Sequence, residues 1–109
     1  LTISDKGSRG ERVDESGEVI RRKIAVLSGE ILKYEIIPDE QRIIKNKLID
    51  FVDYKKIDLI ITTGGTGLSP RDVTPEATLE VIDKEVPGIP QIMRFESLKK
   101  LLTLCFREP

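Results

Sequence analysis

A glycine-rich segment in the middle of the chain has the residue types that bind an anion. Three glycines fall within four positions, with threonines among them, in the run Thr63-Gly64-Gly65-Thr66-Gly67. Glycine permits positive φ angles and lets backbone N–H groups approach a ligand with no Cβ in the way. The alternative is a tight connection that needs glycine only for its geometry. Three glycines followed by a charged pair, Arg71 and Asp72, exceed what a turn requires, so we favour an anion site.

The residues on either side of this segment predict a strand before it and a helix after it. Residues 59–61 are apolar and read as a short buried strand. Beyond the glycines, Thr74 suits the N-cap of a helix, Pro75 its first position, and Glu76 the positive end of its dipole. A strand, a glycine turn and a helix N-terminus together form an anion site at the carboxyl edge of an α/β sheet.

Two further aspartates stand where other predicted strands end. Asp5 follows the strand predicted at residues 1–4, and Asp39 follows the strand that Pro38 ends. Because the carboxyl ends of parallel strands share one edge of the sheet, we expect Asp5, Asp39 and Asp72 to ring the glycine segment. Carboxylates beside a phosphate make physical sense when a cation such as Mg²⁺ bridges them. The pattern therefore favours nucleotide phosphate chemistry with Mg²⁺.

Each of these carboxylates also has an ordinary structural interpretation. Asp39 could cap the next helix, Asp72 could pair with Arg71 or cap the helix at Thr74, and Asp5 could be a turn residue. The sequence has no Gly-x-x-x-x-Gly-Lys-[Ser/Thr] pattern, which argues against a P-loop kinase.

Strands and helices alternate in the elements that must position these residues. Strands are predicted at residues 1–4, 32–36 and 59–61, and residues 5–10 are predicted to form a loop. Four helices are predicted: one from Asp14 to Gly29, one after Asp39-Glu40, one over residues 75–84 and one over residues 91–102. Their expected inward-facing residues are Val13, Ile20, Ile24, Leu27, Ile44, Leu48, Phe51, Val52, Leu79, Ile82, Met93, Leu98, Leu101 and Leu102. This order predicts an α/β fold, a three-layer α/β/α sandwich with a mostly parallel sheet. Three strands are few for four helices, so we expect residues 1–109 to be one incomplete domain, truncated at both ends.

Composition narrows the possible chemistry. The chain has 109 residues, 18 Lys and Arg against 19 Asp and Glu, no histidine and one cysteine. Near-zero net charge removes the broad electrostatic argument for nucleic acid or a membrane surface as a partner. Imidazole and multi-thiolate metal sites are excluded within these residues, so a metal must have oxygen ligands. No apolar run is long enough to span a membrane, and an unpaired Cys105 fits a reducing cytoplasm.

Three sets of residues together resemble a known family. The run Thr62-Thr-Gly-Gly-Thr-Gly67, followed by Arg71-Asp-Val-Thr-Pro-Glu-Ala77, is similar to the signature of molybdenum-cofactor biosynthesis proteins of the MogA/MoaB type. Leu1-Thr-Ile-Ser-Asp5 and Ile37-Pro-Asp-Glu40 resemble the other two strand exits of that family, in the same order. The resemblance covers roughly residues 1–99. It implies the molybdopterin-binding domain fold.

The same resemblance implies a molybdopterin adenylyltransferase, in which molybdopterin and Mg-ATP give adenylyl-molybdopterin and pyrophosphate. Asp39 and Asp72 match the essential aspartates of the family and are expected to be catalytic and to hold Mg²⁺. The remaining expected site residues bind molybdopterin and its phosphate: Ser4, Asp5, Thr63, Gly64, Gly65, Thr66, Gly67, Arg71 and Thr74. No side-chain nucleophile is needed. A homotrimer of the full-length protein, a molybdenum-insertion partner protein and a cytoplasmic location are further expectations.

The end of the chain departs from the family pattern. Residues 101–109 diverge after Lys100, and a later loop that completes the nucleotide side of the site is absent from the sequence. We therefore expect a truncated end, with a shifted reading frame as one explanation. A catalytically inactive molybdopterin-binding carrier, or an assembly module, is the alternative function.

Overall fold

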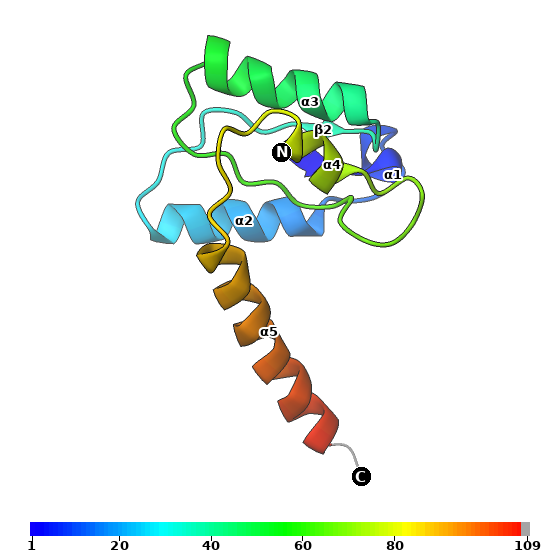
Figure 1. Cartoon of the computed structure of the whole chain (residues 1–109), viewed down its shortest axis with the longest axis vertical. Helices are drawn as coiled ribbons and strands as arrows, with labels where there is room; N and C mark the ends of the chain where they lie inside the picture. The colour runs from blue at the N-terminus through cyan, green and yellow to red at the C-terminus, as the bar shows by residue number, and fades with distance from the viewer. Residues whose placement is uncertain (108–109) are drawn as a thin grey trace.

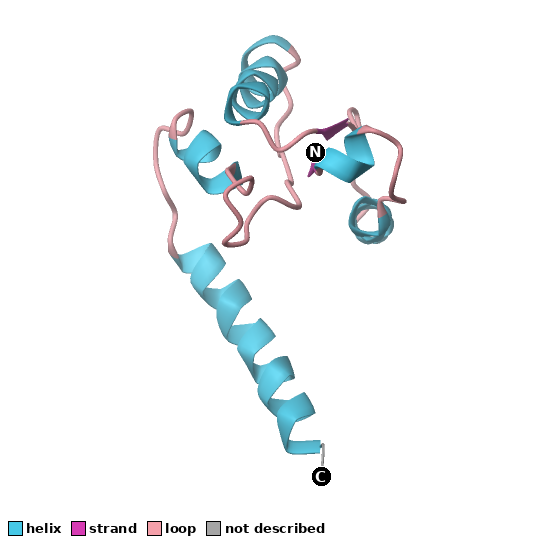
Figure 2. Cartoon of the chain, turned by 90° about the vertical axis from the view of Figure 1, so that its right-hand side faces the viewer, coloured by secondary structure: helices cyan, strands magenta, loops and turns pink. Residues whose placement is uncertain are grey.

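The computed structural model describes residues 1–107 of the chain, and the side chains of residues 1–98. Two strands, β1 (Thr2–Ile3) and β2 (Ile36–Ile37), form a parallel pair. The helices are α1 (Asp5–Ser8), α2 (Glu15–Val26), α3 (Gln41–Ile49), α4 (Thr74–Leu79) and α5 (Gly88–Arg107), and a π-helical turn, Asp50–Tyr54, continues α3. In Figure 1, α2 lies on one side of β2 and α3 on the other. Figure 2 shows the short strands between the helices from the side. The fold is α/β, as predicted.

The parallel strands bring three chain segments to one edge. Thr2 pairs with Ile36 and Ile3 with Ile37, while Thr63 forms a parallel bridge to Thr2 on the opposite side of β1. The backbone N–H of Ile3 donates to the carbonyl of Thr63 at 2.8 Å. The exits after β1, β2 and Thr63 therefore lie side by side, because all three segments run in the same direction.

The strands are shorter than predicted. Residues 59–61 form no strand, and of residues 32–36 only Ile36 belongs to one. Leu59 is 70% exposed and Leu32 is 59% exposed, so these apolar side chains find little cover among the described residues. A strand gains stability from packing its faces as well as from its ladder, and these segments lack that packing.

Two helix starts follow from capping side chains. The Ser4 hydroxyl accepts a hydrogen bond from the Gly7 N–H at 3.0 Å and begins α1, where the sequence predicted a loop. Asp14 accepts from the Gly17 N–H at 3.0 Å and begins α2, as predicted. The predicted apolar stripe of α2 is wrong at its two ends, since Val13 and Leu27 are largely exposed beyond the helix limits.

The core lies between the strands and the α3–α4 pair. Its buried side chains confirm the predictions for Ile44, Leu48 and Phe51, and the others are Ile3, Ile37 and Ala77. Val52 was predicted to be buried but is 52% exposed. The π-helical turn, in which the Lys55 N–H donates to the Asp50 carbonyl at 2.9 Å, widens the helix there and changes the face on which Val52 lies.

Later apolar residues are more exposed than predicted. Leu79 and Ile82 lie at the surface, and Ile82 falls outside the helix because α4 ends at Leu79 and not near residue 84. Helix α5 begins three residues before its predicted start and projects away from the rest of the molecule, so Met93 and Leu98 are exposed (Figure 1). The described residues therefore leave its predicted inward face largely uncovered. Leu101, Leu102 and Cys105 lie outside the residues whose side chains are described. The backbone of the divergent tail is helical as far as residue 107.

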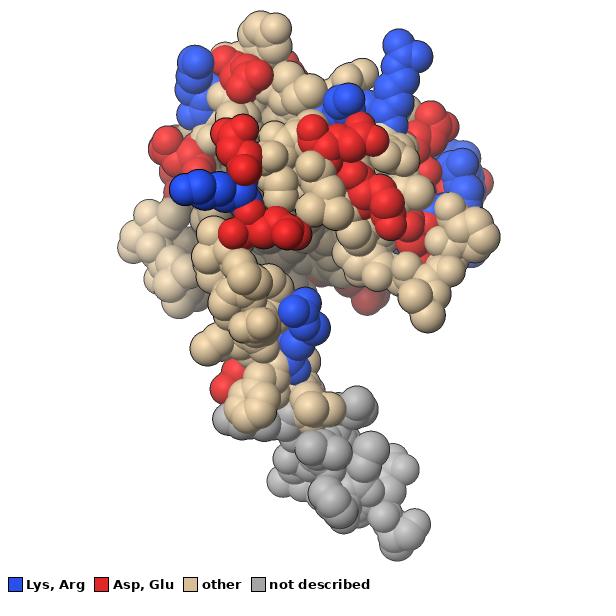
Figure 3. All heavy atoms as spheres, viewed as in Figure 1, with Lys and Arg blue, Asp and Glu red and all other residues tan. Residues whose placement is uncertain are grey.

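Two properties of the whole described chain bear on its surroundings. Within residues 1–107, no helix is both long and apolar enough to cross a bilayer. Acidic and basic side chains both occur on the face drawn in Figure 3.

Candidate functional site

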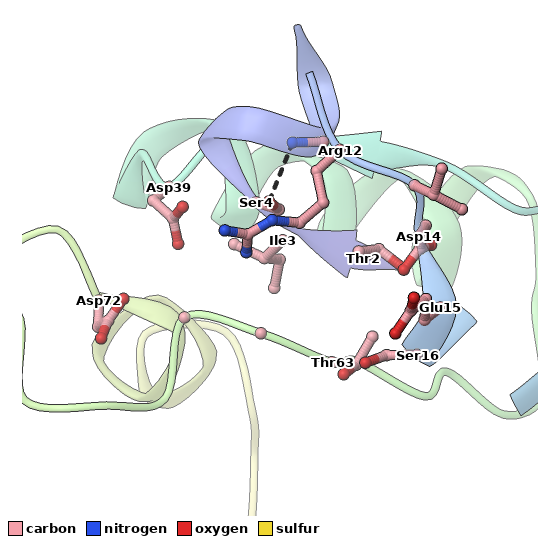
Figure 4. A pocket seen from close by; sticks show the side chains of 14 residues that line it. Thr2, Ile3, Ser4, Arg12, Asp14, Glu15, Ser16, Asp39, Thr63 and Asp72 are labelled. Atoms are coloured by element: carbon pink, nitrogen blue, oxygen red, sulfur yellow. Dashed lines mark hydrogen bonds between the residues drawn. The ribbon is translucent and has the colours of Figure 1, made fainter. Parts of the chain in front are cut away.

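A cavity of about 760 Å³ opens at the edge where the three parallel segments end. Figure 4 shows Asp39 and Asp72 on one side of it and Asp14, Glu15 and Ser16 on the other. The floor and the rim come from the end of β1, the glycine turn and the start of α2. The residues that line the cavity are Thr2, Ile3, Ser4, Gly7, Arg12, Val13, Asp14, Glu15, Ser16, Asp39, Thr63, Gly64, Gly65 and Asp72.

The glycine turn passes directly over β1. Gly64 and Gly65 have φ angles of +94° and +66°, which L-residues with a Cβ rarely adopt. A Cβ on Gly64 would lie 2.1 Å from the carbonyl oxygen of Ile3, and one on Gly65 would lie 2.9 Å from Oδ1 of Asp39. Glycine is thus required both for the backbone conformation and for the close approach to β1 and to Asp39.

Thr74 holds this turn in place. Its hydroxyl donates to the Gly64 carbonyl at 2.9 Å, and its backbone N–H donates to the Gly65 carbonyl at 3.1 Å. Thr74 is buried and is the first residue of α4, so Val73 takes the N-cap position that was predicted for Thr74. The predicted cap is wrong because the Thr74 hydroxyl bonds backward to the glycine turn.

Asp5 and Asp39 join two of the strand exits. The Asp5 N–H donates to Oδ2 of Asp39 at 2.9 Å, and the Asp39 N–H donates to Oδ1 of Asp5 at 3.0 Å. Each carboxylate thus accepts a hydrogen bond from the backbone N–H of the other aspartate, just beyond the end of the neighbouring strand. Glu40 is the N-cap residue of α3, and among the described residues no side chain caps that helix, so Asp39 does not act as its cap.

Arg71 ties the third exit to the first. Its Nε and Nη2 donate to the two carboxylate oxygens of Asp5 at 3.0 and 2.9 Å, a bidentate ion pair. The hydrogen bonds from Arg71, and then the one from the Asp39 backbone, hold the pKa of Asp5 below its ordinary value. Arg71 therefore pairs with Asp5, and not with Asp72 as one sequence interpretation allowed.

Asp39 and Asp72 present oxygens toward the cavity region. Oδ1 of Asp39 is buried and has no hydrogen-bond partner among the described residues, which is costly for a carboxylate oxygen. Oδ2 of Asp72 accepts from the Ser69 N–H at 3.3 Å, and a Cβ on Gly67 would lie 2.6 Å from the same oxygen. Among the described residues, Asp72 does not cap α4.

The structure brings some of the predicted site residues together and leaves others at its margin. Those that line the cavity are Ser4, Asp39, Thr63, Gly64, Gly65 and Asp72. Within the described residues, the members of the predicted set outside that lining are Asp5, Thr66, Gly67, Arg71 and Thr74. Asp5, Arg71 and Thr74 instead hold the three exits together through the bonds given above.

The start of α2 was missed as part of the site. Arg12, Glu15 and Ser16 line the cavity, and Asp14 was expected only to cap the helix. The segment that follows the first strand begins at the same edge of the sheet as the other strand exits. The strand order could therefore have predicted that the residues before and at the start of α2 lie beside the site.

Asp14 is held firmly in this wall. Its Oδ2 accepts hydrogen bonds from the hydroxyls of Thr2, at 2.6 Å, and of Tyr34. Burial by itself would raise the pKa of Asp14, but hydrogen bonds from Thr2, Tyr34 and the Gly17 N–H outweigh burial and lower it. The bond between Tyr34 and Asp14 also raises the pKa of Tyr34.

These features define an α/β protein with a polar, glycine-lined cavity at the carboxyl edge of its parallel strands, where such folds bind phosphorylated ligands. Residues 1–106 match the family model described as "Probable molybdopterin binding domain". The chain therefore belongs to the family of molybdopterin-binding domains.

Characterised relatives agree with this assignment. The chain is 42% identical over 105 residues to the molybdopterin adenylyltransferase of Helicobacter pylori strain J99, a match that covers 94% of this chain and 60% of that protein. It is 42% identical over 100 residues to the molybdopterin adenylyltransferase of Escherichia coli K12, covering 90% of this chain and 51% of that protein. The chain thus spans between half and three fifths of the length of these curated relatives.

Solved structures show the same fold. The molybdopterin biosynthesis enzyme MoaB of Thermus thermophilus superposes with a TM-score of 0.83 at 52% identity, covering 87% of this chain and 60% of that one. The tungsten cofactor synthesizing protein MoaB of Pyrococcus furiosus gives a TM-score of 0.76 at 38% identity, covering 91% and 60%. The expected molybdopterin-binding fold is confirmed.

Proposed function

We propose that this chain carries the molybdopterin site of a molybdopterin adenylyltransferase, which converts molybdopterin and ATP to adenylyl-molybdopterin and pyrophosphate. The observation that best supports the proposal is the convergence of Asp39, Asp72 and the glycine turn on one cavity at the carboxyl edge. The match of 42% identity to adenylyltransferases over 94% of this chain adds independent support.

In the proposed reaction, an oxygen of the terminal phosphate of molybdopterin attacks the α-phosphorus of ATP. A new phosphorus–oxygen bond forms while the bond to the bridging oxygen breaks, and that oxygen leaves with its electron pair in pyrophosphate. The protein mainly positions the two phosphates and stabilises charge, so no covalent intermediate on a side chain is needed. The glycine turn would cradle the molybdopterin phosphate, with Ser4 and Thr63 beside it.

The residues present fit a magnesium ion that arrives with ATP. Among the described residues, no group of three or more Asp, Glu or Cys side chains is close enough to hold a metal by itself. Mg²⁺ commonly uses one or two carboxylates together with substrate phosphates, and Asp39 has a buried oxygen that lacks a described partner. Asp39 and Asp72 would hold the ion. Magnesium, when bound, would neutralise the triphosphate and the departing pyrophosphate.

A pyrophosphate-release assay with molybdopterin, ATP and Mg²⁺ tests this function. We expect release that requires all three components, and we expect Asp72→Asn to lower its rate by roughly 100-fold or more while the urea midpoint stays close to wild type. Ser69→Ala is a matched control, because it leaves the backbone N–H that bonds to Asp72 in place. Release at an unchanged rate in Asp72→Asn would contradict the assigned role of Asp72.

A molybdopterin carrier without catalysis is the second candidate function. The chain covers only 60% of the Helicobacter pylori relative, so a site built here can bind one substrate without completing the other half. Calorimetric binding of molybdopterin with no pyrophosphate release would select the carrier. Failure to bind molybdopterin at all would exclude both functions.

The expectations for assembly, partner and location also remain proposals. We propose a homotrimer of the full-length protein, contact with a molybdenum-insertion protein, and a cytoplasmic location. Sedimentation equilibrium of the full-length protein tests the first, and a species of one chain mass at all concentrations would exclude the trimer.

A further inference from the structure

Arg12 is the only cation among the described residues that line the cavity. We propose that Arg12 is a substrate-positioning residue whose guanidinium binds a substrate phosphate, an inference that rests on the function proposed above. The roles proposed above for the glycine turn and for Asp39 and Asp72 do not involve this residue, which lies in the loop before α2.

The neighbouring arginines are already occupied. Arg71 is committed to Asp5 by two hydrogen bonds, and Arg9 makes an ion pair with Glu11 at 3.0 Å. Arg12, by contrast, makes no ion pair and no side-chain hydrogen bond with any described residue. Its guanidinium is therefore free for a ligand without breaking an internal contact.

The position of Arg12 suits a phosphate in the cavity. Figure 4 shows its side chain extending across the cavity, toward the side on which Asp39 and Asp72 lie. The start of α2, with the partial positive charge of a helix N-terminus, forms the same wall of the cavity.

The charge balance of the cavity gives Arg12 its importance. Four carboxylates line the cavity, from Asp14, Glu15, Asp39 and Asp72. A phosphorylated ligand adds further negative charge, and these carboxylates would repel it unless positive charges compensate. Besides a metal ion, the Arg12 guanidinium is the only group with a full positive charge in the described lining. Guanidinium also matches phosphate oxygens in a bidentate geometry that an ammonium group cannot reproduce.

Two ligands carry this chemistry: the terminal phosphate of molybdopterin and the polyphosphate of ATP. Calorimetric titration of Arg12→Gln with each ligand in turn distinguishes them. We expect one affinity to fall by roughly 10- to 100-fold, the usual effect of losing a charged hydrogen-bonded pair, and Arg12→Lys to lose less. Arg22→Gln is the matched control, since Arg22 is exposed on α2 and does not line this cavity.

The phosphate-free compounds, dephosphorylated molybdopterin and adenosine, separate phosphate binding from a general loss of structure. Their affinities should be the same for wild type and Arg12→Gln. A loss confined to molybdopterin assigns Arg12 to the pterin phosphate, and a loss confined to ATP assigns it to the nucleotide. Unchanged affinity for both ligands overturns the proposal for Arg12 and leaves the proposed function intact. If wild type binds neither ligand, the proposed function fails first and this inference falls with it.

Discussion

The close approach of the glycine turn to β1 makes Gly64→Ala a sharp test of how the site is built. Gly64 has a φ of +94°, and a Cβ there would meet the Ile3 carbonyl oxygen at 2.1 Å. A carbon–oxygen contact relaxes at roughly 3.3 Å, so the turn must retreat from β1 by about 1.2 Å. That movement would stretch the 2.8 Å hydrogen bond between the Ile3 N–H and the Thr63 carbonyl.

The size of the effect follows from these two costs. A left-handed backbone conformation costs an alanine about 1–2 kcal/mol relative to glycine, and a lost backbone hydrogen bond costs about 1 kcal/mol or more. We therefore expect Gly64→Ala to lower the free energy of unfolding by about 2–4 kcal/mol, a large part of the total for a small domain. Urea denaturation followed by circular dichroism measures this change.

Two other glycines separate the contributions. Gly10 has a φ of +74° but no described atom within 4 Å of a Cβ added there, so Gly10→Ala reports the conformational cost of about 1–2 kcal/mol without a clash. Gly88→Ala, at a position with neither feature among the described residues, should leave stability unchanged or slightly raised. If Gly64→Ala costs no more than Gly10→Ala, the contact with Ile3 does not hold the turn and the reasoning is refuted.

Further predictions concern the bonds that join the strand exits. Arg71→Gln should destabilise the fold at neutral pH, because Arg71 lowers the pKa of Asp5 from its ordinary value of 3.8. A lowered carboxyl pKa stabilises the fold above pH 3.8, and this stabilisation is lost as the pH falls through the folded-state pKa of Asp5. The difference in urea midpoint between Arg71→Gln and wild type should therefore vanish in acid. A difference that stays constant from neutral pH to strong acid would contradict this reasoning. Thr74→Val should cost about 1 kcal/mol through the lost bond to the Gly64 carbonyl, and an unchanged midpoint would exclude that role. Thr2→Val should cost a similar amount, because Oδ2 of Asp14 then keeps only its bond from Tyr34; a midpoint equal to wild type would show that Tyr34 alone suffices.

The sequence predicted the parts of the site that depend on local chemistry. Glycines at positions 64 and 65 signal backbone conformations closed to other residues, and the positive φ angles confirm them. Asp14 was predicted to cap α2 because aspartate is a favoured N-cap residue, and that prediction is confirmed. The aspartates at the strand exits followed from the rule that parallel strands end at one edge.

Predictions failed where burial depends on distant segments. Periodicity places Val52 and Ile82 on an inward face, but the π-helical turn and the early end of α4 leave them exposed. Residues 59–61 are apolar enough for a strand, yet the described chain covers them on too few sides. Local composition cannot show which surfaces a neighbouring element will cover.

The sequence by itself determined the alternation of elements, the glycine turn and the family to which the chain belongs. Only the tertiary structure decided which charged residues pair with one another and which face the cavity. Asp5 and Arg71 pair across 66 positions of sequence and hold the exits together, whereas Asp39 keeps a buried oxygen without a described partner. Arg9 and Arg71 are paired with Glu11 and Asp5, whereas Arg12 makes no ion pair with a described residue. Such pairings depend on distances between segments that are far apart in the chain, and residue type and spacing do not contain those distances.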